Sequence, residues 1–365
     1  MCIRDSSKAA QRLIGAVKRK ERIVVYADYD VDGATSGAML VSWFRFFNLE
    51  PSIYVPDRIR EGYGPNKTAM TRLSSNNELI ICVDCGTLGH EALETVHEDC
   101  DVIILDHHLG SEEDPKCHSI VNPNRQIESG GLSYLCAAGV VFLTLVECGR
   151  QLKYSNQTSP NLMDYLDLVA LGTVADVAPL TGVNRAFVRQ GLKILSNRMR
   201  LGLKLLIDKS GINSSPTSYH LGYILSPKLN APGRIGPADL ALKLLCSTST
   251  SEANDLCEQI EELKGLLAEK EAEVRAEGSR EMLKQQAEVE RLKTMMEWKA
   301  KIVEDDVKFR TESGWRERTK MLVQEIEHLR QVMEATMMEK RAAETALRDL
   351  GVKLSQKDQA LSMSQ

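Results

Sequence analysis

The sequence predicts an α/β fold with a mainly parallel sheet flanked by helices, followed by a long helical tail. Over the first 250 residues, short apolar runs alternate with helix-length segments and Gly/Pro/Asn turns. Acidic residues directly follow several of these runs, and proline is absent after residue 252, where Glu, Lys, Arg, Gln, Met and Ala dominate. We therefore expect a non-native or disordered leader at 1–9, an α/β domain at 10–250, and a linking helix with a coiled-coil tail at 251–365.

The strands and helices of the α/β domain are predicted from the length and residue content of each segment. Short runs rich in Val and Ile are typical of strands, and the longer segments between them predict helices that cross over to the next parallel strand. The predicted strands are Ile23–Ala27, Ser52–Val55, Leu79–Val83 and Val102–Leu105. The predicted helices are Ser36–Phe47, Asn66–Leu73, His90–His97, Leu135–Cys148 and Leu162–Leu171.

The tail carries a heptad pattern that begins at Leu322. Apolar residues fill most a and d positions, which predicts a coiled coil and self-association through it. Lys340 and Thr336 interrupt the seam near its middle. The a positions are Ile326, Met333, Lys340, Leu347, Leu354 and Leu361, and the d positions are Leu322, Leu329, Thr336, Ala343 and Leu350.

Composition restricts the location and the partners of the chain. The net charge of −5 gives no overall basic surface, so any contact with nucleic acid has to be local. No stretch approaches about 20 continuous apolar residues, so we expect no membrane span. The first residues lack the apolar run of a signal peptide, and the 9 cysteines are scattered. A reducing cytoplasm fits these features best.

The segment DYDVDG, residues 28–33, follows the first predicted strand and places three carboxylates on alternate positions. Carboxylates that lie this close repel one another, and a cation relieves the repulsion. The spacing also matches the start of a calcium-binding EF-hand loop, but that loop needs Glu at its twelfth position, where this chain has Met39. It also needs a preceding helix, and Ile23–Ala27 reads as a strand. The acidic triplet therefore predicts a metal other than calcium.

Other candidate ligands also follow apolar segments. Asp84 comes after the third predicted strand, and Asp106, His107 and His108 come after the fourth. Asp176 follows the predicted helix Leu162–Leu171. Because parallel sheets gather ligands at the carboxyl ends of their strands, we expect these side chains to meet. Mixed Asp and His ligands favour manganese or magnesium over structural zinc, and two such ions about 4 Å apart would suit phosphate chemistry.

Each of these features has an alternative interpretation when taken alone. A single Asp after a strand, such as Asp84, is often the N-cap of the next helix. A His pair is more often part of a polar surface than of a metal site. Asp30 and Asp32 alone would also fit a haloacid-dehalogenase-type phosphatase, in which the first Asp is a nucleophile. The four segments together, in this order, favour the metal site.

The four segments DYDVDG, VDCG, DHH and GTVADVAPL resemble the motifs of the DHH phosphoesterase superfamily, and within it the RecJ-type exonucleases. Further similar stretches are VPDRIREGYG (55–64), VNPN (121–124), AAGVVFLTL (137–145) and LSPKLNAPGRIG (225–236). The resemblance implies a DHH domain at 10–250 with two divalent ions, manganese preferred and magnesium as the alternative. It also implies 5′-to-3′ hydrolysis of single-stranded DNA in repair and recombination, in the bacterial cytoplasm, with a single-stranded-DNA-binding protein as a further partner.

The resemblance also implies roles for individual residues. Asp84 would bridge the two ions, and Asp28 would be a further ligand or support one. Asp106 would orient the histidine ligand, and His108 would face the scissile phosphate. Asn230, Arg58 and Arg234 would bind substrate, although Arg58 could instead form a surface salt bridge with Asp57 or Glu61. The implied metal ligands are Asp28, Asp30, Asp32, Asp84, His107 and Asp176.

The tail departs from the family pattern. RecJ-type proteins continue into a DHHA1 domain and an OB-fold, and neither is found in this sequence, so we expect an intact metal site with impaired processive degradation. Two alternatives stay open. One is a DHH phosphodiesterase that acts on short oligonucleotides or cyclic dinucleotides. The other is a non-catalytic DHH module with a coiled-coil interaction tail.

Overall fold

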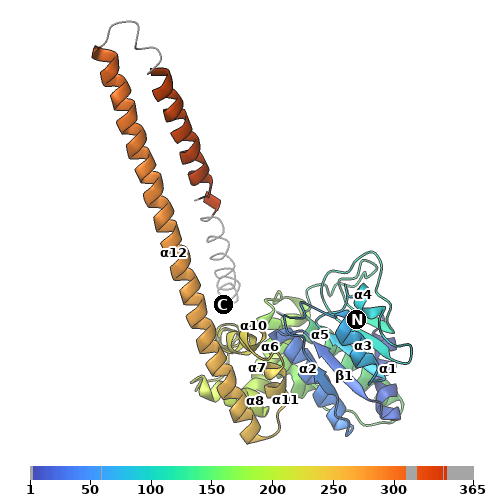
Figure 1. Ribbon diagram of the computed structural model, residues 1–365. Helices are drawn as coiled ribbons and strands as arrows, with labels where there is room; N and C mark the ends of the chain where they lie inside the picture. The colour runs from blue at the N-terminus through green and yellow to red at the C-terminus, as the bar shows by residue number, and fades with distance from the viewer. Residues whose placement is uncertain (1–2, 59, 310–318, 340, 343–365) are drawn as a thin grey trace. The chain divides into compact units, whose positions relative to one another are not determined.

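The computed structural model describes residues 3–58, 60–309, 319–339 and 341–342. The chain divides into one compact unit within Met1–Leu267 and a second within Ala268–Met363 (Figure 1). In the described residues, no helix combines the length and the apolar character that crossing a membrane requires.

The first unit is built on a five-stranded parallel sheet with the strand order β2-β1-β3-β4-β5, which confirms the predicted fold class. Its ladder is in register at the carboxyl edge, where Ala27 pairs with Val83, Val83 with Leu105, and Leu105 with Val121. The residues that directly follow these four strands therefore lie side by side at the same edge of the sheet. The strands are β1 (Ile23–Ala27), β2 (Ser52–Tyr54), β3 (Leu79–Val83), β4 (Asp101–Leu105) and β5 (Ser119–Val121).

Helices cover both faces of the sheet, so β1 and β3 are buried along their whole length. Residues such as Tyr26 and Ile80 form one core with Met70 of α3 and Leu93 of α4. Val25 faces the other way, toward α2. This double burial explains why the strands read as continuous apolar runs. The helices are α1 (Ser6–Arg19), α2 (Val31–Phe46), α3 (Lys67–Ser74), α4 (His90–Leu93), α5 (Ala137–Tyr154), α6 (Leu166–Ala175), α7 (Gly182–Ser196), α8 (Leu201–Lys209), α9 (Ser226–Asn230), α10 (Pro232–Ile235), α11 (Leu240–Cys246) and α12 (Thr250–Phe309).

Two of the predicted domain boundaries differ from those of the first compact unit. Ile3 is buried and α1 begins at Ser6, so residues 3–9 belong to the folded unit and are not a disordered leader. At the other end, α12 begins at Thr250, but its first turns stay in the first unit. The buried side chains of Cys257 and Ile260 supply the reason, because an apolar stripe here packs on the core.

The described part of the second unit is helical. Residues 319–339 form a helix in which the heptad positions Leu322, Ile326, Leu329 and Met333 are half-buried, while the residues between them are exposed. Glu325 of this helix pairs with Lys299 of α12. The heptads beyond this helix, from Lys340 to Leu361, mostly lie outside the described residues. Self-association through a coiled coil therefore stays a prediction.

Candidate metal centre and phosphate pocket

Three of the predicted site residues lie at the shared carboxyl edge of the sheet. The backbone N–H of Asp28 donates to Val83 O (3.2 Å), that of Asp84 donates to Leu105 O (3.0 Å), and that of Asp106 donates to Val121 O (3.2 Å). Each of these acids thus continues the ladder by one residue beyond its strand. The parallel register brings together side chains that lie about 80 residues apart in sequence.

The rest of the first motif turns directly into α2. Asp30 is the N-cap of α2, because its Oδ1 accepts hydrogen bonds from the N–H groups of Asp32 (2.8 Å) and Gly33 (3.0 Å). Gly33 lies so close to the Asp28 carbonyl that a Cβ atom would overlap the carbonyl oxygen. This contact explains the glycine after the third Asp.

The carboxylate of Asp32 is fixed by a second helix. Its two oxygens accept from the N–H groups of Ala137 (2.6 Å) and Ala138 (2.9 Å), at the start of α5. Such N–H groups have no partner within their own helix and favour an anion. A Cβ atom on Gly172 of α6 would lie 2.7 Å from Asp32 Oδ1, so this glycine allows α6 to approach the site. That approach brings Asp176, the C-cap of α6, to the same place.

The predicted ligands converge around His107. Its Nε2 lies 3.2 Å from Asp84 Oδ1 and 3.9 Å from Asp32 Oδ2, while its Nδ1 lies 3.9 Å from Asp176 Oδ2. Three sets of side chains each place their possible ligand atoms within 4.8 Å of one another. Asp84 belongs to two of these sets, and so does His107. The sets are Asp84 with His107 and His108, Asp32 with His107 and Asp176, and Asp28 with Asp30 and Asp84.

The electrostatics of this cluster favour the binding of cations. Burial, and then the neighbouring carboxylates, raise the pKa of Asp28 to about 7 and that of Asp176 to about 8. The same two causes hold the pKa of Asp84 well above its ordinary value. Asp28 Oδ1 and Asp84 Oδ1 are buried, and neither accepts a hydrogen bond within the described residues. Two such oxygens, with Asp and His around them, fit divalent manganese or magnesium.

The structure shows which of the two adjacent histidines Asp106 contacts. Its Oδ1 accepts the backbone N–H of His107 (2.7 Å) but contacts the ring of His108, whose Nδ1 lies 2.7 Å away. The carboxylate of Asp106 therefore contacts the ring of His108 and not that of the predicted ligand His107. Burial alone would raise the pKa of Asp106, but the hydrogen bond from His108 outweighs this effect and holds the pKa of Asp106 well below its ordinary value. The same hydrogen bond raises the pKa of His108.

Two asparagines after β5 hold the DHH segment and were not predicted as site residues. The buried Asn122 donates from Nδ2 to His108 O (2.8 Å) and to Thr87 Oγ1 (2.9 Å). Asn124 donates from Nδ2 to His107 O (2.6 Å). The position of Asn122 directly after an apolar run was the available signal, but that run is only Ile120 and Val121, too few residues to indicate a strand.

Tyr63 is a second residue that sequence reasoning missed. Its hydroxyl donates to Asp84 O (3.2 Å) and lies 3.1 Å from His108 Nε2. The Tyr63 side chain is about half exposed beside the site. Only the folded loop brings Tyr63 to His108, and no spacing in the sequence indicates it.

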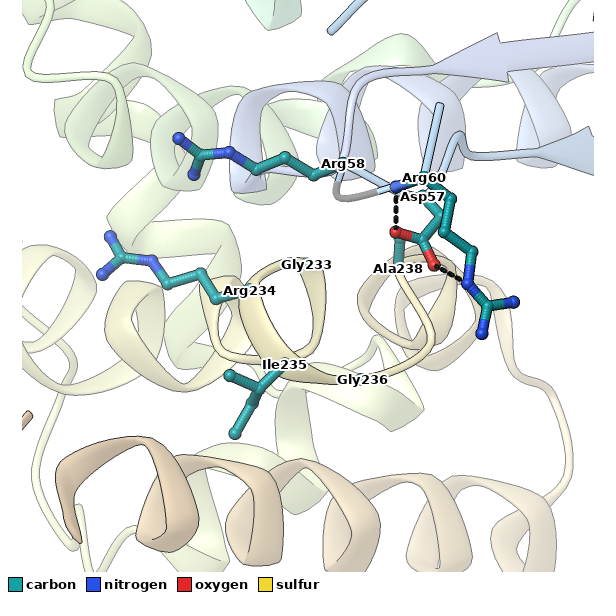
Figure 2. A pocket seen from close by; sticks show the side chains of 8 residues that line it. All are labelled: Asp57, Arg58, Arg60, Gly233, Arg234, Ile235, Gly236 and Ala238. Atoms are coloured by element: carbon teal, nitrogen blue, oxygen red, sulfur yellow. Dashed lines mark hydrogen bonds and ion pairs between the residues drawn. The ribbon is translucent and has the colours of Figure 1, made fainter. Parts of the chain in front are cut away.

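A pocket of about 370 Å³ lies between the segment after β2 and helix α10, and its lining includes Arg58, Arg60 and Arg234. Figure 2 shows the Arg58 and Arg234 side chains extending toward the same side, while Arg60 turns the other way and pairs with Asp57 at 4.0 Å. The guanidinium of Arg58 lies 5.2 Å from the ring centroid of Tyr29 in the first motif. The pocket therefore adjoins the metal-ligand segment.

Asn230 lies at the end of α9, just before this pocket. Its Oδ1 accepts the N–H of Val31, 3.0 Å away, in the first motif. The structure thus ties Asn230 to the DYDVDG loop. Two parts of the chain 199 residues apart are joined by this bond.

Comparison with known proteins agrees with this geometry. The model of the DHH family, N-terminal domain, matches residues 22–173. The single-stranded-DNA-specific exonuclease RecJ of Bacillus subtilis is 37% identical over 72% of this chain and 32% of its own length, and that of Thermus thermophilus is 33% identical over 70% and 37%. The chain thus spans about a third to a half of the curated RecJ proteins it matches.

Solved structures are similar over the same region. A crystal structure of exonuclease RecJ bound to manganese superposes with a TM-score of 0.70 at 31% identity, over 77% of this chain and 71% of that one. The crystal structure of Thermus thermophilus RecJ in complex with Mn²⁺ gives 0.66 at 29% identity, over 76% and 40%. The motifs, the parallel sheet and these similarities agree, and the chain belongs to the DHH family, with a DHH domain of the RecJ type.

Proposed function

We propose that this chain is a divalent-metal-dependent phosphodiesterase that hydrolyses single-stranded DNA from the 5′ end, with the first compact unit as its catalytic domain. The observation that carries the proposal is the convergence of Asp32, Asp84 and Asp176 on His107 beside an arginine-lined pocket. The RecJ proteins to which the chain is similar are named single-stranded-DNA-specific exonucleases.

The metal site is assigned to the residues at the carboxyl edge of the sheet. Asp28, Asp30, Asp32, Asp84, His107 and Asp176 would hold two divalent ions, manganese or magnesium. Asp84 would bridge the ions, because it belongs to two of the three ligand sets. Bound cations of this kind activate a phosphodiester toward attack by water.

The protein's own groups then position the substrate. Arg58 and Arg234 bind phosphate oxygens in the pocket, where the planar guanidinium can grip two oxygens at once. Asp106 Oδ1 accepts a hydrogen bond from His108 Nδ1, and the other ring nitrogen, Nε2, lies beside the Tyr63 hydroxyl. His108 thereby offers a proton to the leaving oxygen or a positive charge to the phosphate. A buried carboxylate behind the imidazole keeps that charge stable.

We also expect a cytoplasmic location, contact with a single-stranded-DNA-binding protein, and self-association through the tail.

The proposal is tested by assaying the purified chain on a labelled, 5′-phosphorylated oligothymidylate. Release of mononucleotides from the 5′ end with Mn²⁺, abolished by EDTA, is the expected result. His108→Ala should reduce the rate by at least about a hundredfold, the lower range for losing a general acid. His97→Ala is the matched control, because His97 is 57% exposed and pairs only with Asp99 in the described residues. Hydrolysis of cyclic or short dinucleotides with none of the longer strand would contradict the proposal.

A further inference from the structure

Helix α7 carries a basic face that the proposed site does not use. Arg185, Arg189 and Lys193 recur at every fourth residue and are all exposed. The opposite face packs into the unit through residues such as Phe187 and Leu195. The helix contains no Asp or Glu, although the chain as a whole has a net charge of −5. The positive charge on α7 is therefore a local concentration in an acidic protein.

Among the described residues, no ion pair neutralises the charges on this face. No carboxylate forms an ion pair with any of the three side chains in the part of the chain that the structure describes. Other basic residues of the same unit are paired, as Arg200 is with Asp167 (2.8 Å) and Lys209 with Glu258 (3.0 Å). The three cations also line a hollow of about 480 Å³, together with Gly182, Ala186 and Gln190.

The basic face begins beside the metal centre. Helix α6 ends at the ligand Asp176, and the chain enters α7 six residues later, at Gly182. Near that start, Val183 N donates to Tyr134 Oη (3.3 Å), and Asn184 Nδ2 donates to Tyr134 O (2.8 Å). The residue before Tyr134, Ser133, has its carbonyl bonded to the same Asn124 amide that holds His107 O.

The face then runs away from the metal centre. Gly191, near the end of α7, lies so close to Leu166 O, at the start of α6, that a Cβ atom would overlap it. The two helices are therefore antiparallel, and Arg185, Arg189 and Lys193 lie at increasing distance from Asp176. Four residues of α-helix rise by about 6 Å, which is of the order of the spacing between consecutive phosphates in an extended single strand.

We propose that this face of α7 binds backbone phosphates of the single strand, on a path that leads away from the hydrolysed nucleotide. The inference rests on the proposed function for the identity of the ligand. Three evenly spaced cations without carboxylate partners in the described residues suit a linear polyanion better than a single small anion. The contacts are to phosphates, so they confer affinity and no base preference.

The test measures binding without metal, so that no strand is cut. Fluorescence anisotropy in EDTA would follow 5′-phosphorylated oligothymidylates of about 4 and about 16 nucleotides over a salt series, with the full chain. For the longer strand, R185Q/R189Q/K193Q should lower the slope of log affinity against log salt by about two, at roughly 0.7 per phosphate contact. The shorter strand should show a much smaller change, because it does not reach along α7.

The matched control removes three positive charges at the other edge of the sheet. Lys18 and Lys20 lie where α1 leads into β1, and Lys153 lies in the last turn of α5, whose first residues bind Asp32. K18Q/K20Q/K153Q should leave the slope unchanged. An unchanged slope in the α7 variant, or an equal loss in the control variant, would overturn the inference. So would an α7 variant that loses binding to anionic vesicles but keeps its affinity for the longer strand.

The inference and the proposed function can fail separately. Absence of manganese-dependent hydrolysis by the unaltered chain would refute the proposed function. A slope reduced only in the α7 variant would still establish the DNA-binding face.

Discussion

Asn122 gives the most detailed prediction about how the fold supports the site. Its side chain is fully buried and makes three hydrogen bonds. The Nδ2 group donates to His108 O and to Thr87 Oγ1, and Oδ1 accepts from Asn124 N (2.8 Å). Asn122→Ala would leave the His108 carbonyl and the Asn124 N–H without these partners. A buried group left without a partner costs about 1–3 kcal/mol, so loss of partners by these two groups should lower the free energy of unfolding by about 2–6 kcal/mol.

Urea denaturation of the full chain measures this loss, and the metal-dependent rate on the oligothymidylate measures its effect on the site. A domain of ordinary stability, about 5–15 kcal/mol, should stay folded after the change. The rate should fall because the backbone of the DHH segment is no longer held. Asn76→Ala is the control, because Asn76 is exposed and its Nδ2 bonds only to Arg72 O in the described residues. Loss of less than about 0.5 kcal/mol with an unchanged rate would refute the reasoning.

Three further predictions concern the metal-ligand segments. Gly33→Ala should abolish metal binding, measured by calorimetry, because its Cβ would overlap the Asp28 carbonyl; normal binding would contradict that. Mn²⁺ at about 100 times its dissociation constant should stabilise the chain by about 2.7 kcal/mol, or roughly 5–10 °C in a thermal melt, and an unchanged melting temperature would contradict the site. Without metal, stability should fall as pH rises from about 5 to 8. The pKa values of Asp28 and Asp176 are raised to about 7 and 8, so the folded state binds more protons than the unfolded state in that range; rising stability would contradict this.

The sequence predicted the sheet well because its strands are buried on both faces. Four strands appear as apolar runs, and each run coincides with a strand to within one residue at either end. The fifth strand, Ser119–Val121, was missed because its apolar run consists of only Ile120 and Val121. It matters for the site, since it supplies Asn122.

The candidate ligands could be predicted because register alone brings them together. Once β1, β3 and β4 are parallel and in register, the residues that follow them, Asp28, Asp84 and Asp106, lie at one edge of the sheet. The partner of Asp106 could not be predicted in the same way. Which of two adjacent imidazoles reaches a carboxylate depends on the turn after β4, and that turn brings the ring of His108 to Asp106.

Residues that act through loops escaped prediction for a related reason. Tyr63 reaches His108 only because the loop after β2 folds over the carboxyl edge of the sheet. The stacking of Arg58 on Tyr29 depends on two segments about thirty residues apart. Neither contact follows from a repeat or a spacing, and both need the folded chain.

The most direct test of the metal centre is the manganese content of an Asp84→Asn variant. Asn keeps the size of the side chain and tolerates the left-handed backbone at this position, where φ is 60°, but it lacks the charge of a bridging carboxylate. Asp99→Asn, at an 89% exposed side chain, is the control. After equilibration with Mn²⁺ and removal of free metal, elemental analysis should find about two ions in the unaltered chain and in the control, and most of that metal lost from Asp84→Asn. Equal manganese content in all three proteins, with unchanged circular dichroism, would contradict the proposed centre.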